Sequence, residues 1–240
     1  MITLSKSKRV FLSVAVLGFT ISFSGLSAAQ SPKVEEGFDY RILPVAQPVE
    51  AKGKVEVIEF FWYGCPHCYD FEPELSAWVK RQPKDVIFRR VPVAFRDDLM
   101  PHSQLFYTLE AMGKGEAMNE KVMYAMHKEN KRLMTENEIA DWVASQGIDR
   151  NTFLATYRSF AVVSKARAAR QLADAYRIDG VPTIVMQGRY VTSPSIAGTK
   201  AKAIAVMDYL EQKIRKDKYK WFKILDFDET SYDPKIEWVG

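Results

Sequence analysis

Apolar and polar positions along the chain follow two periods, one typical of strands and one typical of helices. Residues 55–62 form a run rich in β-branched and aromatic side chains, which predicts a strand buried on both faces. Residues 85–91 predict a second strand that ends or bends at Pro92, and residues 40–43 are a short strand candidate before the first. These segments supply the first strands of a sheet.

A helical stripe follows the first buried strand. Phe71, Leu75, Trp78 and Val79 recur at spacings of three and four, which predicts a helix over residues 66–80. The proline at the start of this range suits the first helical turn, where a missing N–H costs nothing. We therefore expect the strand at 55–62 to lead through a short turn into this helix.

The middle of the chain, from about residue 96 to 164, shows helical periodicity and no convincing strand. Helices are predicted to begin at Pro101, to span 116–128, and to follow the capping residues Thr135 and Asp149. The methionines of these helices fit core positions at helical spacing. The alternative is that they form an adaptable peptide-binding surface.

The last part of the chain returns to mixed structure. A helix is predicted from about residue 164 to 176, and another begins at Thr199. Between them, residues 184–186 and 189–191 flank Gln187-Gly188, a spacing typical of a two-residue β-hairpin. The full order is β-β-α-β, then helices, then α-β-β-α.

Without the middle helices, this is the element order of thioredoxin. We therefore predict an α/β protein that has a thioredoxin fold with an inserted all-helical domain. The thioredoxin-like domain is expected to be discontinuous, over residues 30–96 and 165–216. The helical domain occupies residues 97–164, and residues 217–240 form a C-terminal extension.

The first 29 residues have the composition of a cleaved secretory signal. Lys6, Lys8 and Arg9 precede an apolar stretch, and Ser27-Ala28-Ala29 suits a cleavage site. A membrane anchor is the alternative, but the stretch is shorter than the ~20 apolar residues that a spanning helix needs. The segment holds three of the 34 Lys and Arg residues and none of the 30 Asp and Glu residues, so the remaining chain is close to neutral. We therefore do not expect nucleic-acid binding.

The only two cysteines lie in the motif Cys65-Pro66-His67-Cys68. A zinc site needs about four ligands, and with three histidines in all no second ligand pair completes one. A structural disulfide would close so short a loop that it removes little unfolded-state entropy. The motif beside a strand and a helix instead indicates a redox-active pair.

The predicted helix gives the two cysteines different roles. Cys65 lies at the helix N-terminus, where free N–H groups and the helix dipole lower a thiol pKa, and His67 is expected to lower it further. Cys65 is therefore the candidate nucleophile. Cys68 lies one turn into the helix, is expected to be more buried, and would act as the resolving thiol.

These residues resemble the DsbA family, periplasmic thiol:disulfide oxidoreductases of Gram-negative bacteria. The resemblance rests on Ile58-Glu59-Phe60-Phe61, on the eight residues from Cys65 to Glu72, and on Gly180-Val181-Pro182-Thr183 with the hairpin after it. It covers about residues 34–215. The departures are the longer tail and Trp62-Tyr63-Gly64 just before the first cysteine.

The resemblance implies three further site residues. Pro182 would follow a cis peptide bond and face the disulfide, and Val181 would offer its backbone to an extended substrate. Glu59 shares a strand face with Val55 and Val57. The resemblance implies that it is a buried acid beneath Cys68 that shuttles a proton, whereas the alternative is a strand-end acid that reaches water.

The activity implied is donation of the Cys65–Cys68 disulfide to reduced, unfolded secreted proteins in the periplasm. The expected partner for reoxidation is a quinone-linked membrane protein of the DsbB type, and no metal or organic cofactor is implied. The family's isomerases are dimers with an N-terminal dimerisation domain, and residues 30–50 are too few for one, which favours the oxidase. We also expect a monomer. A reductase or isomerase on the same scaffold, and a chaperone-like peptide binder, are the alternatives.

Overall fold

The computed structural model describes residues 33–51 and 53–225, of which residues 218–225 are described by their backbone alone. The predicted signal segment 1–29 lies outside the described residues. The strands are β1 (Arg41–Ile42), β2 (Val55–Phe61), β3 (Val86–Pro92), β4 (Thr183–Met186) and β5 (Tyr190–Thr192). The α-helices are α1 (Pro66–Lys80), α2 (Met100–Ala111), α3 (Gly115–His127), α4 (Glu136–Ser145), α5 (Arg150–Tyr157), α6 (Phe160–Ala175), α7 (Pro194–Ala197) and α8 (Lys200–Leu225), and a short 3-10 helix spans Asp97–Leu99.

The five strands form one sheet in the order β1-β5-β4-β2-β3. Strand β2 is parallel to β3 and antiparallel to β4, so it is paired on both sides and buried along its whole length. The predicted hairpin joins β4 to β5. Gln187 and Gly188 take positive φ at its turn, and Arg189 stands between this turn and the first paired residue, Tyr190.

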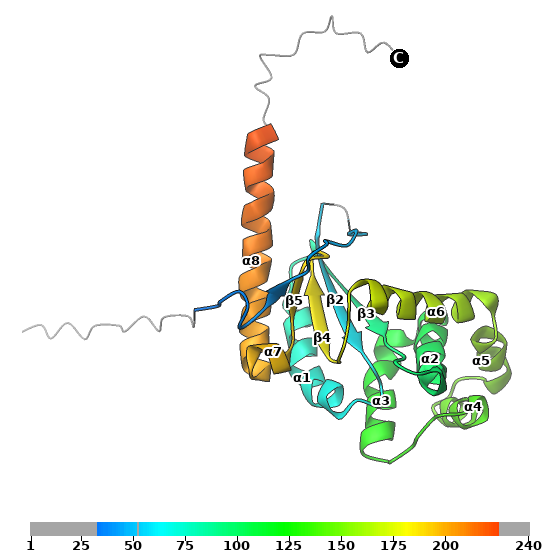
Figure 1. The fold of residues 1–240 in the computed structure, drawn as a ribbon. Coiled ribbons are helices and arrows are strands. Elements are labelled where there is room, and N and C mark those ends of the chain that lie inside the picture. Colours follow the sequence, from blue (N-terminus) through cyan, green and yellow to red (C-terminus); the bar gives the residue numbers. More distant parts are fainter. Residues whose placement is uncertain (1–32, 52, 226–240) are drawn as a thin grey trace, which may run out of the picture. The chain divides into compact units, whose positions relative to one another are not determined.

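Helices cover both faces of the sheet (Figure 1). On one face, Phe71 and Leu75 of α1 and Leu210 of α8 pack in one core cluster with Val57. On the other face, Ala173 of α6 packs with strand residues such as Phe60. A sheet covered in this way on both faces is the thioredoxin fold that the element order predicted.

Helices α2 to α5 build a third core cluster beside the sheet (Figure 1). Leu105, Val122, Ile139 and Phe153 each come from a different one of these helices and are fully buried. The helical insertion is thus present. Thr135 and Asp149 cap α4 and α5 as predicted, Thr135 through a complete capping box.

Two helices extend beyond their predicted ends. Helix α6 begins at Phe160, because the Ser159 side chain caps it by accepting a hydrogen bond from the Val162 N–H. The expected boundary between the helical domain and the second part of the thioredoxin-like domain, at residues 164 and 165, therefore falls inside one helix. Helix α8 continues to Leu225, past the expected end of the thioredoxin-like domain at residue 216. No glycine or proline interrupts residues 200–225.

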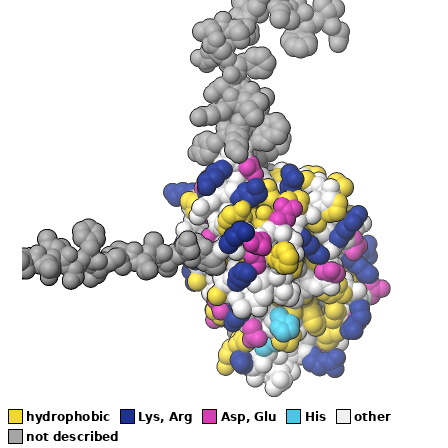
Figure 2. All heavy atoms as spheres, turned by 60° about the vertical axis from the view of Figure 1, so that its left-hand side comes forward, with side chains coloured by type: hydrophobic (Ala, Val, Ile, Leu, Met, Phe, Trp, Pro, Cys, Tyr) yellow, Lys and Arg dark blue, Asp and Glu magenta, His cyan; other side chains and the backbone are white. Residues whose placement is uncertain are grey.

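On the face shown in Figure 2, lysine and arginine side chains are interspersed with aspartate and glutamate, so its charge is mixed. Within residues 33–51 and 53–225, no helix is long and apolar enough to cross a lipid bilayer.

Candidate active site

Cys65 occupies the position that the sequence predicted, at the start of α1. It is the N-cap residue, and Pro66 follows in the first helical turn. The Cys65 carbonyl accepts hydrogen bonds from the backbone N–H groups of Cys68 and Tyr69, each at 3.1 Å. Cys65 is 7% exposed and Cys68 is fully buried, whereas Pro66 and His67 between them are exposed. Both cysteines are free thiols, so the structure is that of the reduced protein.

The three residues before Cys65 shape its approach. A Cβ atom on Gly64 would lie 2.4 Å from the Trp62 ring, so the close approach of this ring requires glycine there. Tyr63 is buried against Phe61 and Phe106. The departure from the family pattern at Trp62-Tyr63-Gly64 is therefore a packed unit of this fold.

The second loop of the site lies directly before β4. The peptide bond between Val181 and Pro182 is cis, as the resemblance implied. The Cys65 thiol donates a hydrogen bond to the Val181 carbonyl at 3.3 Å. Two segments more than a hundred residues apart in sequence therefore meet at the nucleophilic sulfur.

The surroundings of Cys65 favour its thiolate. The pKa of Cys65 is lowered to about 6, first by a hydrogen bond from the Cys68 side chain and then by the backbone N–H groups of Cys68 and His67. The charge of His67 lowers it further, while burial opposes these effects. The sequence anticipated the helix terminus and His67, but not that the partner thiol has the largest effect.

Cys68 is perturbed in the opposite direction. Burial raises the pKa of Cys68, and the hydrogen bond to Cys65 and the charge of Glu59 raise it further. One thiol is therefore ionised near neutral pH while the other holds its proton. This asymmetry makes Cys65 the nucleophile of the pair.

Glu59 lies within the sheet, and its side chain is fully buried. Its Oε2 accepts a hydrogen bond from the Arg90 Nε at 2.9 Å, and a second Arg90 nitrogen donates to Glu72 at 2.7 Å. Burial raises the pKa of Glu59 to about 7 even though the Arg90 charge opposes the rise. The other oxygen, Oε1, has no hydrogen-bond partner among the described residues. The alternative that Glu59 reaches water is excluded.

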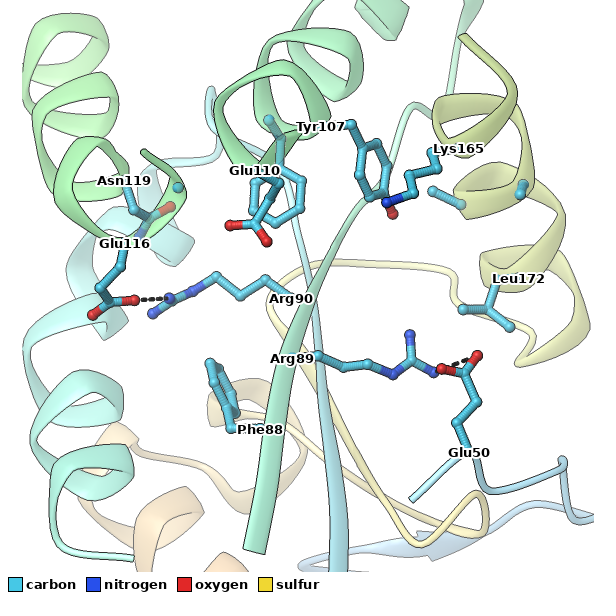
Figure 3. Close-up of a pocket in the computed structure, with 14 residues that line it drawn as sticks. Glu50, Phe88, Arg89, Arg90, Tyr107, Glu110, Glu116, Asn119, Lys165 and Leu172 are labelled. Carbon is cyan, nitrogen blue, oxygen red and sulfur yellow. Dashed lines mark ion pairs between the residues drawn. The ribbon is translucent and has the colours of Figure 1, made fainter. Parts of the chain in front are cut away.

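Arg90 connects this buried acid to the surface. Figure 3 shows its side chain extending from β3 toward Glu116 of α3, and the two groups are 3.8 Å apart. Arg90 also lines a pocket of about 610 Å³, which is bordered by Tyr107 and Lys165. Its side chain therefore contacts Glu59, Glu72 and Glu116 together.

Sequence reasoning missed Arg90. The signal was present, because two consecutive arginines interrupt the apolar strand at residues 85–91. The parallel register pairs Glu59 with Arg90, and only this register reveals that the two charges meet. His102 and His127 were also missed; their ring nitrogens contact Trp62 and the Tyr63 carbonyl, respectively. Among the described residues, no cluster of His, Cys, Asp and Glu could hold a metal ion.

Comparisons with known proteins agree with this geometry. A family model described as "DSBA-like thioredoxin domain" matches residues 56–205. The chain is 44% identical over 196 residues to the thiol:disulfide interchange protein DsbA of Burkholderia cepacia, an alignment that covers 81% of this chain and 92% of the relative. It is 43% identical over 188 residues to DsbA of Pseudomonas aeruginosa strain PAO1, which covers 78% of this chain and 89% of that protein.

Solved structures give the same result. The crystal structure of Pseudomonas aeruginosa DsbA superposes with a TM-score of 0.74 at 42% identity, covering 78% of this chain and 97% of that one. The oxidoreductase DsbA from Xylella fastidiosa superposes with a TM-score of 0.71 at 32% identity, covering 78% and 99%. The similarity therefore spans nearly the full length of these relatives.

Proposed function

Because the chain belongs to the DsbA family of thiol:disulfide interchange proteins, we propose that it donates its Cys65–Cys68 disulfide to reduced, unfolded secreted proteins. It is a protein-disulfide oxidoreductase with a thioredoxin fold. The observation that supports disulfide donation, rather than reduction, is the contrast between the lowered pKa of Cys65 and the raised pKa of Cys68. A lowered pKa at Cys65 stabilises the reduced form, which makes the disulfide form an oxidant.

The transfer proceeds in two exchange steps. A substrate thiolate attacks the Cys65 sulfur of the oxidised protein, which forms a mixed disulfide and breaks the Cys65–Cys68 bond. A second thiolate of the same substrate then attacks the substrate sulfur that is bonded to Cys65. This forms the substrate's disulfide, and Cys65 leaves as a thiolate. The substrate gains a disulfide, the protein gains two electrons, and Cys68 gains a proton. If the second substrate thiol is slow to react, the Cys68 thiolate attacks the Cys65 sulfur, which re-forms the Cys65–Cys68 disulfide and releases the substrate thiolate still reduced.

Glu59 is suited to supply the proton that Cys68 needs when it leaves. A carboxyl with a pKa of about 7 exchanges protons readily at neutral pH, and Glu59 is close enough for its charge to raise the pKa of Cys68. Arg90 is the positioning residue, because it holds one Glu59 oxygen and leaves the other without a described partner.

Val181 is suited to align the substrate. Its carbonyl lies within hydrogen-bond distance of the Cys65 sulfur, and its side chain is half-buried while Pro182 is buried. An extended substrate segment that pairs with this backbone would bring its cysteine to Cys65 in the manner of an added strand.

The cycle needs an oxidant, and we propose a quinone-linked membrane protein of the DsbB type. We also propose that the protein acts as a monomer in the periplasm. The location is supported by the signal-like composition of residues 1–29.

The proposal is tested by mixing stoichiometric oxidised protein with a reduced, unfolded substrate that carries two cysteines. We expect the substrate to gain one disulfide for each protein molecule that becomes reduced. Binding without disulfide transfer would support the chaperone-like alternative. Reduction of an oxidised substrate by the dithiol form, with no transfer in the other direction, would support the reductase.

Titration of the Cys65 thiolate tests the stabilised nucleophile. Ultraviolet absorbance of the reduced protein should rise with a midpoint near pH 6, and this step should be absent from Cys65→Ser. His67→Ala should move the midpoint upward, because the charge of His67 is one of the causes that lower the pKa of Cys65. A midpoint near ~8.5, the value of a free cysteine, would contradict the account.

A further inference from the structure

A second pocket lies directly beside the nucleophile, on the side of Gly64 and Trp62. Its volume is about 340 Å³. Besides these two residues, its lining includes Leu99, Met126 and Arg132, and we refer to it as the Trp62 pocket. Because Gly64 precedes Cys65 directly, one end of the pocket is within about one residue length of the site of disulfide exchange.

The apolar part of the pocket is held in place by a chain of hydrogen bonds. The Trp62 indole N–H donates to His102 Nδ1 at 2.8 Å, and His102 Nε2 then donates to the Arg132 carbonyl at 3.0 Å. His102 is buried, and this burial lowers its pKa, so it stays neutral with both ring nitrogens engaged. His127 lines the same pocket and donates to the Tyr63 carbonyl at 2.8 Å. The segment before Cys65 and the loop after α3 are therefore tied together.

The loop between α3 and α4 has a conformation that exposes its cations. Asn130 and Leu133 have φ values of 56° and 51°, in the left-handed region that non-glycine residues seldom adopt. Leu133 is 3% exposed and anchors the loop in the helical core, while Lys131 and Arg132 between the two residues are exposed. Such a backbone persists only where its surroundings fix it.

The charge around the Trp62 pocket is unbalanced. Arg96 and Asp98 neutralise each other through two hydrogen bonds of 3.0 and 2.9 Å. No ion pair of Arg132 is found among the described residues, whereas Lys131 is paired with Glu129 at 3.9 Å. Glu138 and Asp141 line the adjoining pocket with both cations, and Asp141 is paired with Arg150. Two cations therefore border an apolar surface formed by Trp62, Leu99 and Met126. A group with a short hydrocarbon stem and a negative end matches this combination.

We propose that the Trp62 pocket binds an aspartate or glutamate side chain of the substrate polypeptide, close in sequence to the substrate's reacting cysteine. This inference rests on the proposed function, because the pocket can act on a substrate only if the substrate's cysteine reacts at the neighbouring Cys65. The stem of the acidic side chain packs on Trp62, and its carboxylate pairs with Arg132 and Lys131. The pocket thereby adds a sequence preference to backbone pairing at Val181.

The test compares reduced peptides that carry one cysteine and one glutamate, placed at each neighbouring position in turn. Each has a matched peptide with glutamine in place of glutamate. The rate of mixed-disulfide formation with the oxidised protein is measured, and each rate is divided by the same peptide's rate with the uncharged disulfide of 2-mercaptoethanol. This division removes the effect of the glutamate on the peptide's own thiol pKa. We expect one position to favour glutamate about threefold at low salt and the preference to fade at high salt.

Charge reversal identifies the cations responsible. Arg132→Glu should reverse the preference, so that a lysine peptide reacts faster than the glutamate peptide at the same position. The matched control is Arg167→Glu, which makes the same charge change on an exposed residue of α6 and should keep the preference. Because each preference is a ratio measured on one protein sample, it does not depend on the fraction that is folded.

Two results would overturn the inference while leaving the proposed function intact. The first is equal transfer to glutamate and glutamine peptides at every position. The second is a preference that is the same at all positions and falls equally in Arg132→Glu and Arg167→Glu, which would indicate general attraction only. Absence of transfer to every peptide would instead count against the proposed function.

Discussion

Arg90→Met is expected to destabilise the reduced protein by about 3 kcal/mol at pH 8. Removing one partner of a buried ion pair leaves the other charge uncompensated, which typically costs ~3–5 kcal/mol. The Arg90 side chain is 9% exposed, and it contacts Glu59, which is fully buried, and Glu72, which is 11% exposed. Methionine fills similar space without the charge, so the loss reports electrostatics more than packing.

The pH dependence of this loss has a definite sign. The Arg90 charge opposes the rise in the pKa of Glu59, so without Arg90 this pKa should rise above its value of about 7. A carboxyl whose folded pKa exceeds its unfolded value favours the folded state at low pH, and this stability is lost as pH rises through the folded pKa. The deficit of Arg90→Met relative to the wild type should therefore be smallest near pH 5 and should grow by up to about 1.4 kcal/mol between pH 7 and pH 8.

Urea unfolding of both proteins across this pH range measures the deficit, and Arg89→Met is the matched control. Arg89 is the neighbouring strand residue, is 26% exposed, and lies 3.7 Å from the buried Glu56. Its replacement should cost less, about 1 kcal/mol, because Arg89 Nε makes no hydrogen bond to Glu56 and the Arg89 side chain is partly solvated. Equal losses for the two variants, or a deficit of Arg90→Met that does not change with pH, would contradict the assignment of Glu59 and Arg90 as a coupled pair.

The second large effect is an inverted order of stability: the reduced protein should be more stable than the oxidised protein at neutral pH. A structural disulfide gives the opposite order, because it restricts the unfolded chain. Folding and redox form a closed thermodynamic cycle. A pair that is more oxidising when folded than when unfolded therefore gives the reduced protein the higher free energy of unfolding.

The ionisation of Cys65 sets the pH window of this effect. Its pKa is about 6 in the folded state and ~8.5 in an unfolded chain, so its contribution is lost as pH falls through 6. We expect about 1 kcal/mol from this ionisation at pH 7 and about 2 kcal/mol at pH 8. Above pH 8.5 the gain from Cys65 should stop growing, because Cys65 is then ionised in the unfolded chain as well. The net gain should fall there, because Cys68, whose folded pKa is raised, resists the ionisation that the unfolded thiol undergoes.

Thermal or urea unfolding with and without dithiothreitol measures this difference, and the double variant of Cys65→Ser and Cys68→Ser controls for effects of the reductant itself. An oxidised form that proves more stable at pH 7 and pH 8 would show that the disulfide is not strongly oxidising. The reductase would then account for the activity better than the oxidase does.

The elements that local pattern determines could be predicted from the sequence. The buried strand, the helix Pro66–Lys80 and the caps at Thr135 and Asp149 each follow from residues within a few positions of one another. The position of Cys65 at a helix N-terminus follows for the same reason. The start of α6 at Phe160 was missed because Ser159 is an ordinary polar residue until its capping geometry is seen.

What the sequence could not supply depends on contacts between distant segments. The pairing of Glu59 with Arg90 needs the register of β2 against β3, and the contact of Cys65 with the Val181 carbonyl needs the packing of two loops. The hydrogen bond from Trp62 to His102 joins the active-site segment to the helical insertion in the same way. Strand register and loop packing are tertiary properties that no local pattern encodes.

The redox equilibrium of the Cys65–Cys68 pair with glutathione tests the central claim most directly. The fraction of reduced protein is measured by alkylation across a series of ratios of reduced to oxidised glutathione. For a disulfide donor we expect a reduction potential clearly above about −220 mV, the upper end of the cytosolic glutathione potential. The protein should then be mostly reduced at ratios where oxidised glutathione still persists. A potential near about −270 mV, as in thioredoxin, would contradict the assignment of this protein as a disulfide donor.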